Sequence, residues 1–456
     1  MTIRQAIASN RFGLGASPGE LASIGAKPQR WLLDQIAGPS RSYEGLRAFS
    51  ASSAVLKEVT DLRSARRKAR MQEDQEEATI KQYGRSVRNH YATQVLARYQ
   101  IACSTTLPFH ERLVHFWSNH FAVSADKQPL AAIAGLFENE AIRPHINGKF
   151  SDMLIAVEQH PAMLVYLDNQ QSVGPDSRVG KRRLKRGRPG GLNENLAREI
   201  LELHTLGVDG GYSQTDVTNF AKMITGWSVG TEKANAGQFF FRSTAHQPGS
   251  QTLLGKTFKN TGVNQGIAAL HELAVQEATA RHLATKLARH FVADSPPGSI
   301  VDALTRSYMK SGGELGDLYE TLVLHADAWP QQPKKYKSPS DFLISSMRAF
   351  NYEPDRARRL FQSLEYLGQA PFRPGSPAGW PDTALDWGGP DALLKRITWS
   401  NSAGNLIKGI QDPASLGDEV LGKRFTISET RKAILRAESV PQGITMLLAS
   451  PEFQRR

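Results

Sequence analysis

The sequence predicts a mainly α-helical protein: a large bundle-like single unit with one small β-hairpin, at about residues 238–258, and long loops. Three observations support this fold class. Apolar residues recur at helical spacing through most of the chain. Only one stretch looks like strands, where QFFFR and LLGKTF flank a Pro-Gly turn, and we expect His246 to lie exposed at its tip. With 456 residues, 40% of them hydrophobic, the chain can bury a sizeable core.

Composition excludes several classes of protein. The only cysteine is Cys103, so an internal disulfide and a cysteine-based zinc site are both excluded, and its apolar surroundings predict a buried thiol. No stretch approaches the ~18 apolar residues of a membrane span. The N-terminal residues lack the apolar segment of an ordinary secretory signal, so a cytoplasmic location is the default expectation.

The net charge of +12 is concentrated in one segment. Arg178–Arg188 holds seven basic and no acidic residues, so the rest of the chain carries only +5. The surrounding glycines and prolines predict a flexible surface loop over residues 173–191. Its cations could bind an anion or polyanion, and the candidates are Arg182, Arg183, Lys185, Arg186 and Arg188. No aromatic residues are interleaved to stack on bases, which argues against nucleic acid as the ligand.

Residues 55–105 predict a charged helical arm. Both signs of charge alternate at spacings that favour ion pairs along a solvated helix. The apolar seam is too thin to favour oligomerisation.

Residues 108–124 predict a compact helix rich in histidine. At 100° per residue, His120 shares a face with Trp117 and Phe121 and therefore points to the core. His115 and Asn119 lie on the adjacent row. Each histidine could be purely structural, but as a group they are candidates for acid–base or metal chemistry.

The polar residues of 192–227 define a second candidate region. His204 lies on the apolar face of its helix, whereas Glu202, two residues away, points about 160° from it. A metal site that includes His204 and Glu202 would therefore need ligands from another helix. His120 is the candidate for such a ligand. Glu199 is a catalytic candidate, and so is Asp168 at the end of an earlier helix. The alternatives are intrahelical ion pairs, helix caps and a histidine bonded to a carbonyl group.

Two further features lie in the C-terminal half. His282, Lys286 and His290 form a cationic row on a predicted helix that also carries an apolar stripe. The segment PFRPGSPAGWPDTALDW predicts a loop long enough to line a pocket.

Several long motifs resemble the bacterial domain-of-unknown-function 1800 family. They are NRFGLGA, FWSNHFAVS, HPAMLVYLDNQQS, GLNENLAREILELHTLGVDGGYSQTDV, GWPDTALDW and LASPEFQRR. They extend over the whole chain, which implies one family-wide unit over residues 1–456. The family has no settled biochemical role. Its genes often neighbour those of the domain-of-unknown-function 1501 family, which is similar to phosphatases and sulfatases and often carries a twin-arginine export signal.

These features lead to three hypotheses of function. The first is a metal-assisted hydrolase or oxidoreductase that binds a transition metal through His120, His204 and Glu202. Its catalytic candidates are His115, Asn119, Glu199 and Asp168. The second, implied by the resemblance, is a non-catalytic partner or chaperone of a domain-of-unknown-function 1501 protein, with co-export to the periplasm. The third is polyanion or nucleic-acid binding through the basic segment.

Overall fold

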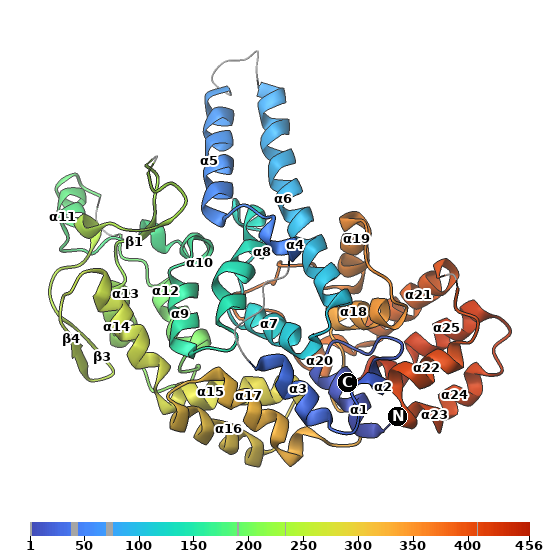
Figure 1. Ribbon diagram of the computed structural model, residues 1–456. Helices are drawn as coiled ribbons and strands as arrows, with labels where there is room; N and C mark the ends of the chain where they lie inside the picture. Colours follow the sequence, from blue (N-terminus) through green and yellow to red (C-terminus); the bar gives the residue numbers. More distant parts are fainter. Residues whose placement is uncertain (1, 38–43, 70–75, 189–190, 233, 408) are drawn as a thin grey trace.

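The computed structural model describes residues 2–37, 44–69, 76–188, 191–232, 234–407 and 409–456. It confirms the mainly helical class (Figure 1). The first helices are α1 (Ile3–Ile7), α2 (Glu20–Ser23), α3 (Pro28–Ile36), α4 (Glu44–Arg47), α5 (Ser52–Ala69), α6 (Glu76–Ser104), α7 (Pro108–His120), α8 (Ala134–Phe137), α9 (Phe150–Glu158), α10 (Pro161–Tyr166), α11 (Arg178–Lys185), α12 (Asn195–Glu199) and α13 (Gln214–Met223). The remaining helices are α14 (Val263–Ala274), α15 (Glu277–Phe291), α16 (Gly298–Ser311), α17 (Leu315–Leu324), α18 (Pro339–Ala349), α19 (Ala357–Leu367), α20 (Ala384–Trp387), α21 (Pro390–Leu406), α22 (Pro413–Leu421), α23 (Lys423–Thr426), α24 (Glu429–Ile434), α25 (Val440–Ala449) and α26 (Pro451–Gln454).

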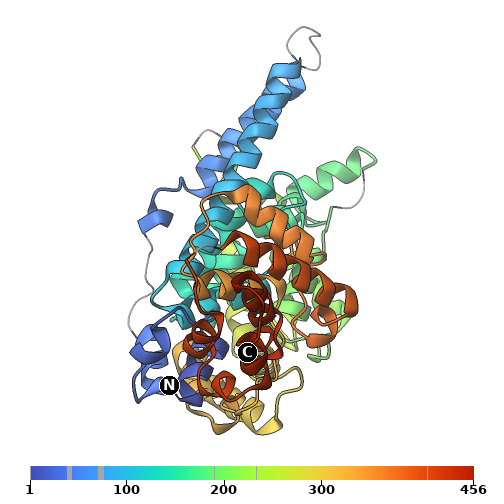
Figure 2. The ribbon, with the colours of Figure 1, turned by 90° about the vertical axis from the view of Figure 1, so that its right-hand side faces the viewer.

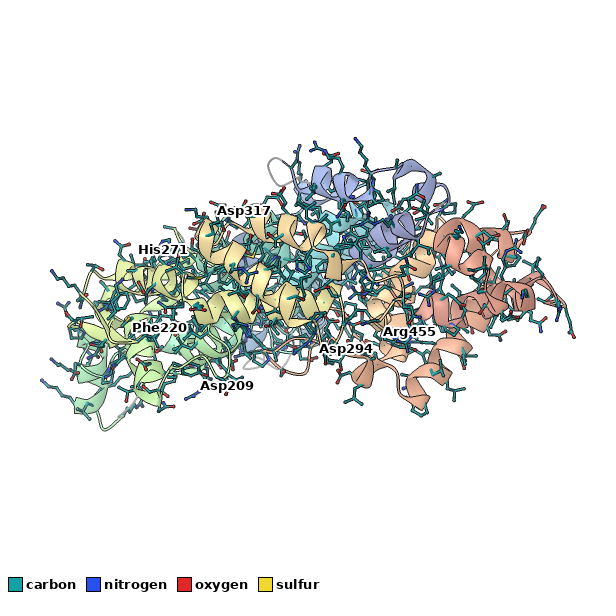
Figure 3. The ribbon with its side chains drawn as sticks, turned by 90° about the horizontal axis from the view of Figure 1, so that it is seen from below. Asp209, Phe220, His271, Asp294, Asp317 and Arg455 are labelled. Atoms are coloured by element: carbon teal, nitrogen blue, oxygen red, sulfur yellow. The ribbon has the colours of Figure 1, made fainter. Side chains whose placement is uncertain are left out.

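Helix α7 lies at the centre of the molecule (Figure 1). Pro108 occupies its first turn, where a missing N–H costs no hydrogen bond, and most of its residues are buried. Seen from below, α15, α16 and α17 form a layer across the underside (Figure 3). The N-terminal helices pack beside α22, and the two chain ends lie near each other (Figures 1 and 2). The central helix is thus enclosed by segments far apart in sequence.

The charged arm consists of two helices, α5 and α6, which project from the body as a pair (Figures 1 and 2). Lys57 and Asp61 form one of the expected ion pairs, with 2.7 Å between Nζ and Oδ2. The C-terminal half of α6 differs from the prediction of a solvated arm. Its residues Val95, Tyr99 and Ala102 are buried in a second apolar cluster, with side chains of α18 and α19.

The β-structure differs from the single predicted hairpin. β1 (Trp227–Val229) pairs with β2 (Phe239–Phe241), and β3 (Gln251–Leu253) pairs with β4 (Lys256–Phe258), both antiparallel. Leu254 and Gly255 form the turn between β3 and β4 with φ angles of 49° and 76°, so the turn lies there and not at Pro-Gly. The predicted exposure of His246 is wrong, because its ring is buried and bonds the Thr225 carbonyl oxygen at 3.0 Å.

The segment 173–191, predicted as a flexible loop, contains the helix α11, which projects from the body (Figure 2). Ser177 caps the helix by accepting a hydrogen bond from the Gly180 backbone N–H at 3.0 Å. Gly180 is required there because a Cβ atom would lie 2.3 Å from the Gly174 carbonyl oxygen. Gly180 therefore serves close packing at the start of a helix.

Most core side chains form one large cluster that runs from α1 to α26. Cys103 is buried, as expected, and burial raises the pKa of its thiol to about 12, which makes it unreactive at neutral pH. Within the described ranges, no helix is both long and apolar enough to cross a membrane.

Candidate functional site

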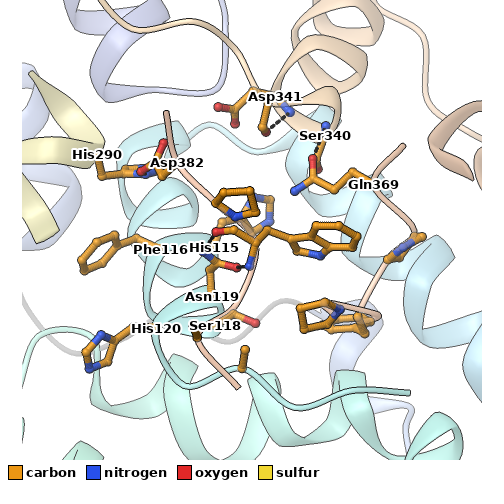
Figure 4. Close-up of a pocket in the computed structure, with 18 of the residues that line it drawn as sticks. His115, Phe116, Ser118, Asn119, His120, His290, Ser340, Asp341, Gln369 and Asp382 are labelled. Atoms are coloured by element: carbon orange, nitrogen blue, oxygen red, sulfur yellow. Dashed lines mark hydrogen bonds and ion pairs between the residues drawn. The ribbon is translucent and has the colours of Figure 1, made fainter. Parts of the chain in front are cut away.

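A cavity of about 370 Å³ lies between α7, α15, the start of α18 and the loop 369–386 (Figure 4). This volume is near the lower end of the range for small-molecule sites. Two of the motifs noted in the sequence meet here, since FWSNH lines one wall and GWPDT another. The cavity is therefore the strongest candidate for a functional site.

His290 and Asp382 form an oriented pair at this cavity (Figure 4). The imidazole Nδ1 lies 2.6 Å from Asp382 Oδ2, so Nδ1–H donates and the lone pair is left on Nε2. That Nε2 is buried and has no hydrogen-bond partner among the described residues. Burial lowers the pKa of His290 to about 4, which keeps the ring neutral and able to accept a proton at pH 7.

Asp382 is fixed by cations on its other oxygen. Its Oδ1 lies 3.3 Å from Lys335 Nζ and 3.9 Å from Arg456 Nη2. Burial opposes ionisation, yet His290, Lys335 and Arg456 together hold the pKa of Asp382 well below its usual value. The carboxylate thus stays charged and in place beside the imidazole.

A second carboxylate, Asp341, lies in the first turn of α18. It pairs with Arg112 Nη1 at 3.2 Å and with Arg456 Nε at 3.1 Å. Burial disfavours its charged form, but the two arginines hold its pKa far below the ordinary value. Its charge is therefore balanced inside the protein, and it supports the site structurally.

Lys286 lies one helical turn before His290 and lines the same cavity. It is half-buried, and none of the described residues forms a hydrogen bond or ion pair with its ammonium group. Burial lowers the pKa of Lys286 to about 8. Arg289, directly before His290, also lines the cavity, and its Nε donates to the Asp294 carbonyl oxygen at 3.2 Å.

Asn119, a predicted catalytic residue, holds the GWPD loop. Its Nδ2 donates to the Trp380 carbonyl oxygen at 2.9 Å, and its Oδ1 accepts from the Trp380 backbone N–H at 2.8 Å. Gly379 makes this approach possible, because its φ is 84° and a Cβ atom would lie 2.3 Å from the Asn119 carbonyl oxygen. Both polar atoms of the Asn119 amide are thus used to position the loop that carries Asp382.

His115, a predicted catalytic residue, lies on α7 and lines the cavity. Its Nε2 lies 3.6 Å from Glu111 Oε1, but Glu111 is already held by two short contacts with Arg143, at 2.6 and 2.8 Å. Burial lowers the pKa of His115 well below 6.5, so the ring is neutral. His115 is therefore a second neutral imidazole in the site, without the close carboxylate that orients His290.

The structure brings His120 and His204 together, with 6.1 Å between ring centroids. His120 Nε2 donates to the His204 carbonyl oxygen at 3.1 Å, and His204 Nδ1 lies 2.8 Å from Glu158 Oε1. The neighbouring Leu203 carbonyl oxygen accepts from His282 Nε2 at 3.0 Å. These carbonyl groups end the π-helical turn η6 (Ile200–His204), where backbone donors are lacking.

The three predicted metal ligands do not form a shared site. Glu202 lies near the Tyr212 hydroxyl, at 3.5 Å, on a different side of the helix from His204. Over the described part of the chain, no three or more His, Cys, Asp or Glu side chains are arranged to hold a metal ion. His120 and His204 instead have partners that fit a structural role.

The other predicted residues lie apart from the cavity, which they do not line. Asp168 has a φ of 59° and pairs with Lys127 at 2.7 Å. Glu199 is half-buried at the end of α12, where burial raises its pKa. The five predicted anion-binding residues lie on α11 and the residues after it; Arg183 is half-buried, and Arg182, Lys185, Arg186 and Arg188 are exposed.

Sequence reasoning missed His290 and Asp382 as a pair. The signals were present separately, as the cationic row ending in His290 and as the aspartate of the GWPD motif. Ninety-two residues separate the two side chains in the chain, so no local spacing could connect them.

The comparisons with known proteins agree with the motif resemblance. No curated protein and no solved structure matches the chain. The family model described as "Protein of unknown function (DUF1800)" matches residues 7–455. The chain therefore belongs to the domain-of-unknown-function 1800 (DUF1800) family.

Proposed function

We propose that this protein is a hydrolase in which His290 acts as the general base. The observation that carries the proposal is the unpartnered Nε2 of His290, which lines a cavity while Asp382 fixes the opposite ring nitrogen. In this reaction Nε2 takes a proton from the attacking water, and the imidazolium then gives that proton to the leaving group. Asp382 orients the ring and stabilises its charged form.

A water nucleophile fits the surroundings of His290. None of the described hydroxyl or thiol groups forms a hydrogen bond with its Nε2, which a nucleophilic serine or cysteine would do. The proposal retains the hydrolase and the His/carboxylate chemistry expected from the sequence. It uses no metal ion, because the described histidines and carboxylates converge on no set of three ligands.

The test is a panel of p-nitrophenyl esters, phosphates and sulfates. His290→Gln should reduce kcat/KM by about 100-fold or more, and Asp382→Asn should also reduce it strongly, since general-base catalysis is worth roughly 10²–10⁴. His271→Gln is the matched control because His271 is exposed on α14 (Figure 3) and does not line the cavity. Undiminished activity of His290→Gln would refute the proposal, and no turnover of any panel member would count against it.

A second candidate function, polyanion binding, is supported by the basic helix α11. Arg182, Arg183, Lys185, Arg186 and Arg188 form no ion pair with residues that the structure describes. Binding to heparin should weaken steeply as salt rises, because counterions are released from the polyanion.

Charge reversal distinguishes this helix from general basicity. Arg182→Glu with Lys185→Glu should elute from heparin at much lower salt than the wild type. The control, Arg306→Glu with Lys310→Glu, changes two exposed cations of α16 and should elute like the wild type. Equal elution of both double variants would exclude α11 as the binding surface.

The same basic helix offers a docking surface for a macromolecular partner. The family resemblance suggests a domain-of-unknown-function 1501 protein, and co-export with it would place the complex in the periplasm. Co-purification of the two proteins tests this, with the α11 double variant as the control. Absence of a complex at micromolar concentrations would argue against it.

A further inference from the structure

We infer that Lys286 forms an oxyanion-binding subsite in this cavity, so that the substrate carries a carboxylate, phosphate or sulfate group next to the bond that is cleaved. This inference rests on the proposed function, since it names the substrate class of the same site. Lys286 and His290 occupy neighbouring turns of α15 and both line the cavity.

The charges around the cavity leave Lys286 uncompensated. Asp341, Asp382 and Asp294 are matched by Arg112, Lys335 and Arg456, in ion pairs between 2.6 and 3.9 Å. Arg98, which also lines the cavity, pairs with Glu138, and Arg143 pairs with Glu138 and Glu111.

Lys286 and Arg289 remain as cations without a carboxylate partner among the described residues. Asp386 is the one lining carboxylate outside the paired groups described above, and it bonds the Thr383 hydroxyl. The cavity therefore favours a ligand with negative charge.

The position of Lys286 limits where that charge can lie. Side chains four residues apart on a helix have Cβ atoms about 5–6 Å apart. An oxyanion on Lys286 would therefore place the adjoining bond within reach of His290. A half-buried ammonium without a partner also binds an anion more strongly than a solvated one, because less water must be displaced.

Four titratable or charged groups interact electrostatically with Lys286. Asp382 of the loop favours the ammonium form, whereas Arg289 of the same helix disfavours it. His120 of α7 and His282 of α15 also interact with it electrostatically. With its pKa near 8, Lys286 should lose affinity for an oxyanion as the pH rises above that value.

Calorimetric titration with inorganic phosphate, sulfate and acetate tests the inference on the full chain. One ammonium–oxyanion contact predicts a dissociation constant of about 1 mM for the preferred probe. Lys286→Met should weaken binding by about tenfold or more, and Lys286→Arg should retain it. The ranking of the three probes decides which oxyanion the substrate carries.

The control is Lys310→Met, which changes an exposed lysine of α16 and should bind like the wild type. His290→Gln should also retain binding, so loss of turnover with retained binding separates the base from the subsite. Circular dichroism of Lys286→Met, together with the result for Lys286→Arg, guards against a folding defect. Wild-type affinity in Lys286→Met, or no binding of any probe by the wild type at about 50 mM, would overturn the inference.

Discussion

Replacing Glu111 by glutamine should destabilise the protein strongly. Glu111 is fully buried on the central helix α7, and its two oxygens lie 2.6 and 2.8 Å from the guanidinium nitrogens of Arg143. Glutamine keeps the size of the side chain but removes its charge. The buried guanidinium then loses its closest counterion, and the next carboxylate, Glu138, lies farther away, at 3.5 Å.

The size of the effect follows from the pKa of Glu111. Burial alone would raise it, but Arg143 and the nearby His115 lower it from 4.5 to about 2. At about 1.4 kcal/mol per pKa unit, this corresponds to about 3 kcal/mol of stability at neutral pH. Breaking a buried ion pair by removing one partner typically costs about 3–5 kcal/mol, in agreement.

The sign of the pH dependence is fixed by the lowered pKa. The stabilisation is complete above pH 4.5, the value in the unfolded chain, and is lost as the pH falls toward about 2. The difference between Glu111→Gln and the wild type should therefore be full at pH 7 and shrink below pH 4.5.

Urea unfolding at a series of pH values measures this difference. The matched control is Asp391→Asn, which breaks an exposed pair with Lys395 at 2.7 Å and should cost less than about 1 kcal/mol. If Glu111→Gln is no more destabilising than Asp391→Asn at pH 7, the buried pair does not contribute as argued.

Three further predictions concern the cavity. Asn119→Ala removes two hydrogen bonds to the GWPD loop and should cost about 2 kcal/mol in urea unfolding, with faster amide exchange in that loop; unchanged exchange would contradict it. Gly379→Ala places a Cβ atom 2.3 Å from a carbonyl oxygen at a φ of 84°, so the melting temperature of this variant should fall. The control Gly375→Ala adds its Cβ atom in open space and should be tolerated. Equal melting temperatures of the two variants would show that no clash occurs. For any substrate found, kcat/KM should fall below about pH 4, as His290 gains a proton, and above about pH 8, as Lys286 loses one; a flat profile would exclude both roles.

Sequence reasoning succeeded where the signal was periodic. The helix predicted over residues 108–124 is confirmed over Pro108–His120 and ends four residues earlier than predicted. The inward direction of His120 and His204 is confirmed, since both side chains are at most 1% exposed. Their meeting in the core is confirmed as well. Apolar spacing carries this information because each helix must bury one face.

Sequence reasoning failed where turn geometry or close packing decided the local structure. Glycines in segment 173–191 suggested a loop throughout, but Gly180 allows the helix α11 to begin against a neighbouring carbonyl group. The Pro-Gly pair at the expected hairpin tip was less important than Leu254 and Gly255, which adopt positive φ angles. Local composition does not reveal which residues must approach each other closely.

The sequence by itself determined the helical class, the family and the inward-facing histidines, because these depend on local periodicity and on long contiguous motifs. Only the tertiary structure decided which polar groups act together. In the folded chain His120 bonds to a backbone carbonyl group, and His204 bonds to a buried glutamate. His290 pairs with Asp382, which lies in a distant segment of the chain. The reason is physical: a buried polar atom takes the partner that the packing of helices supplies, and that packing is a property of the whole chain.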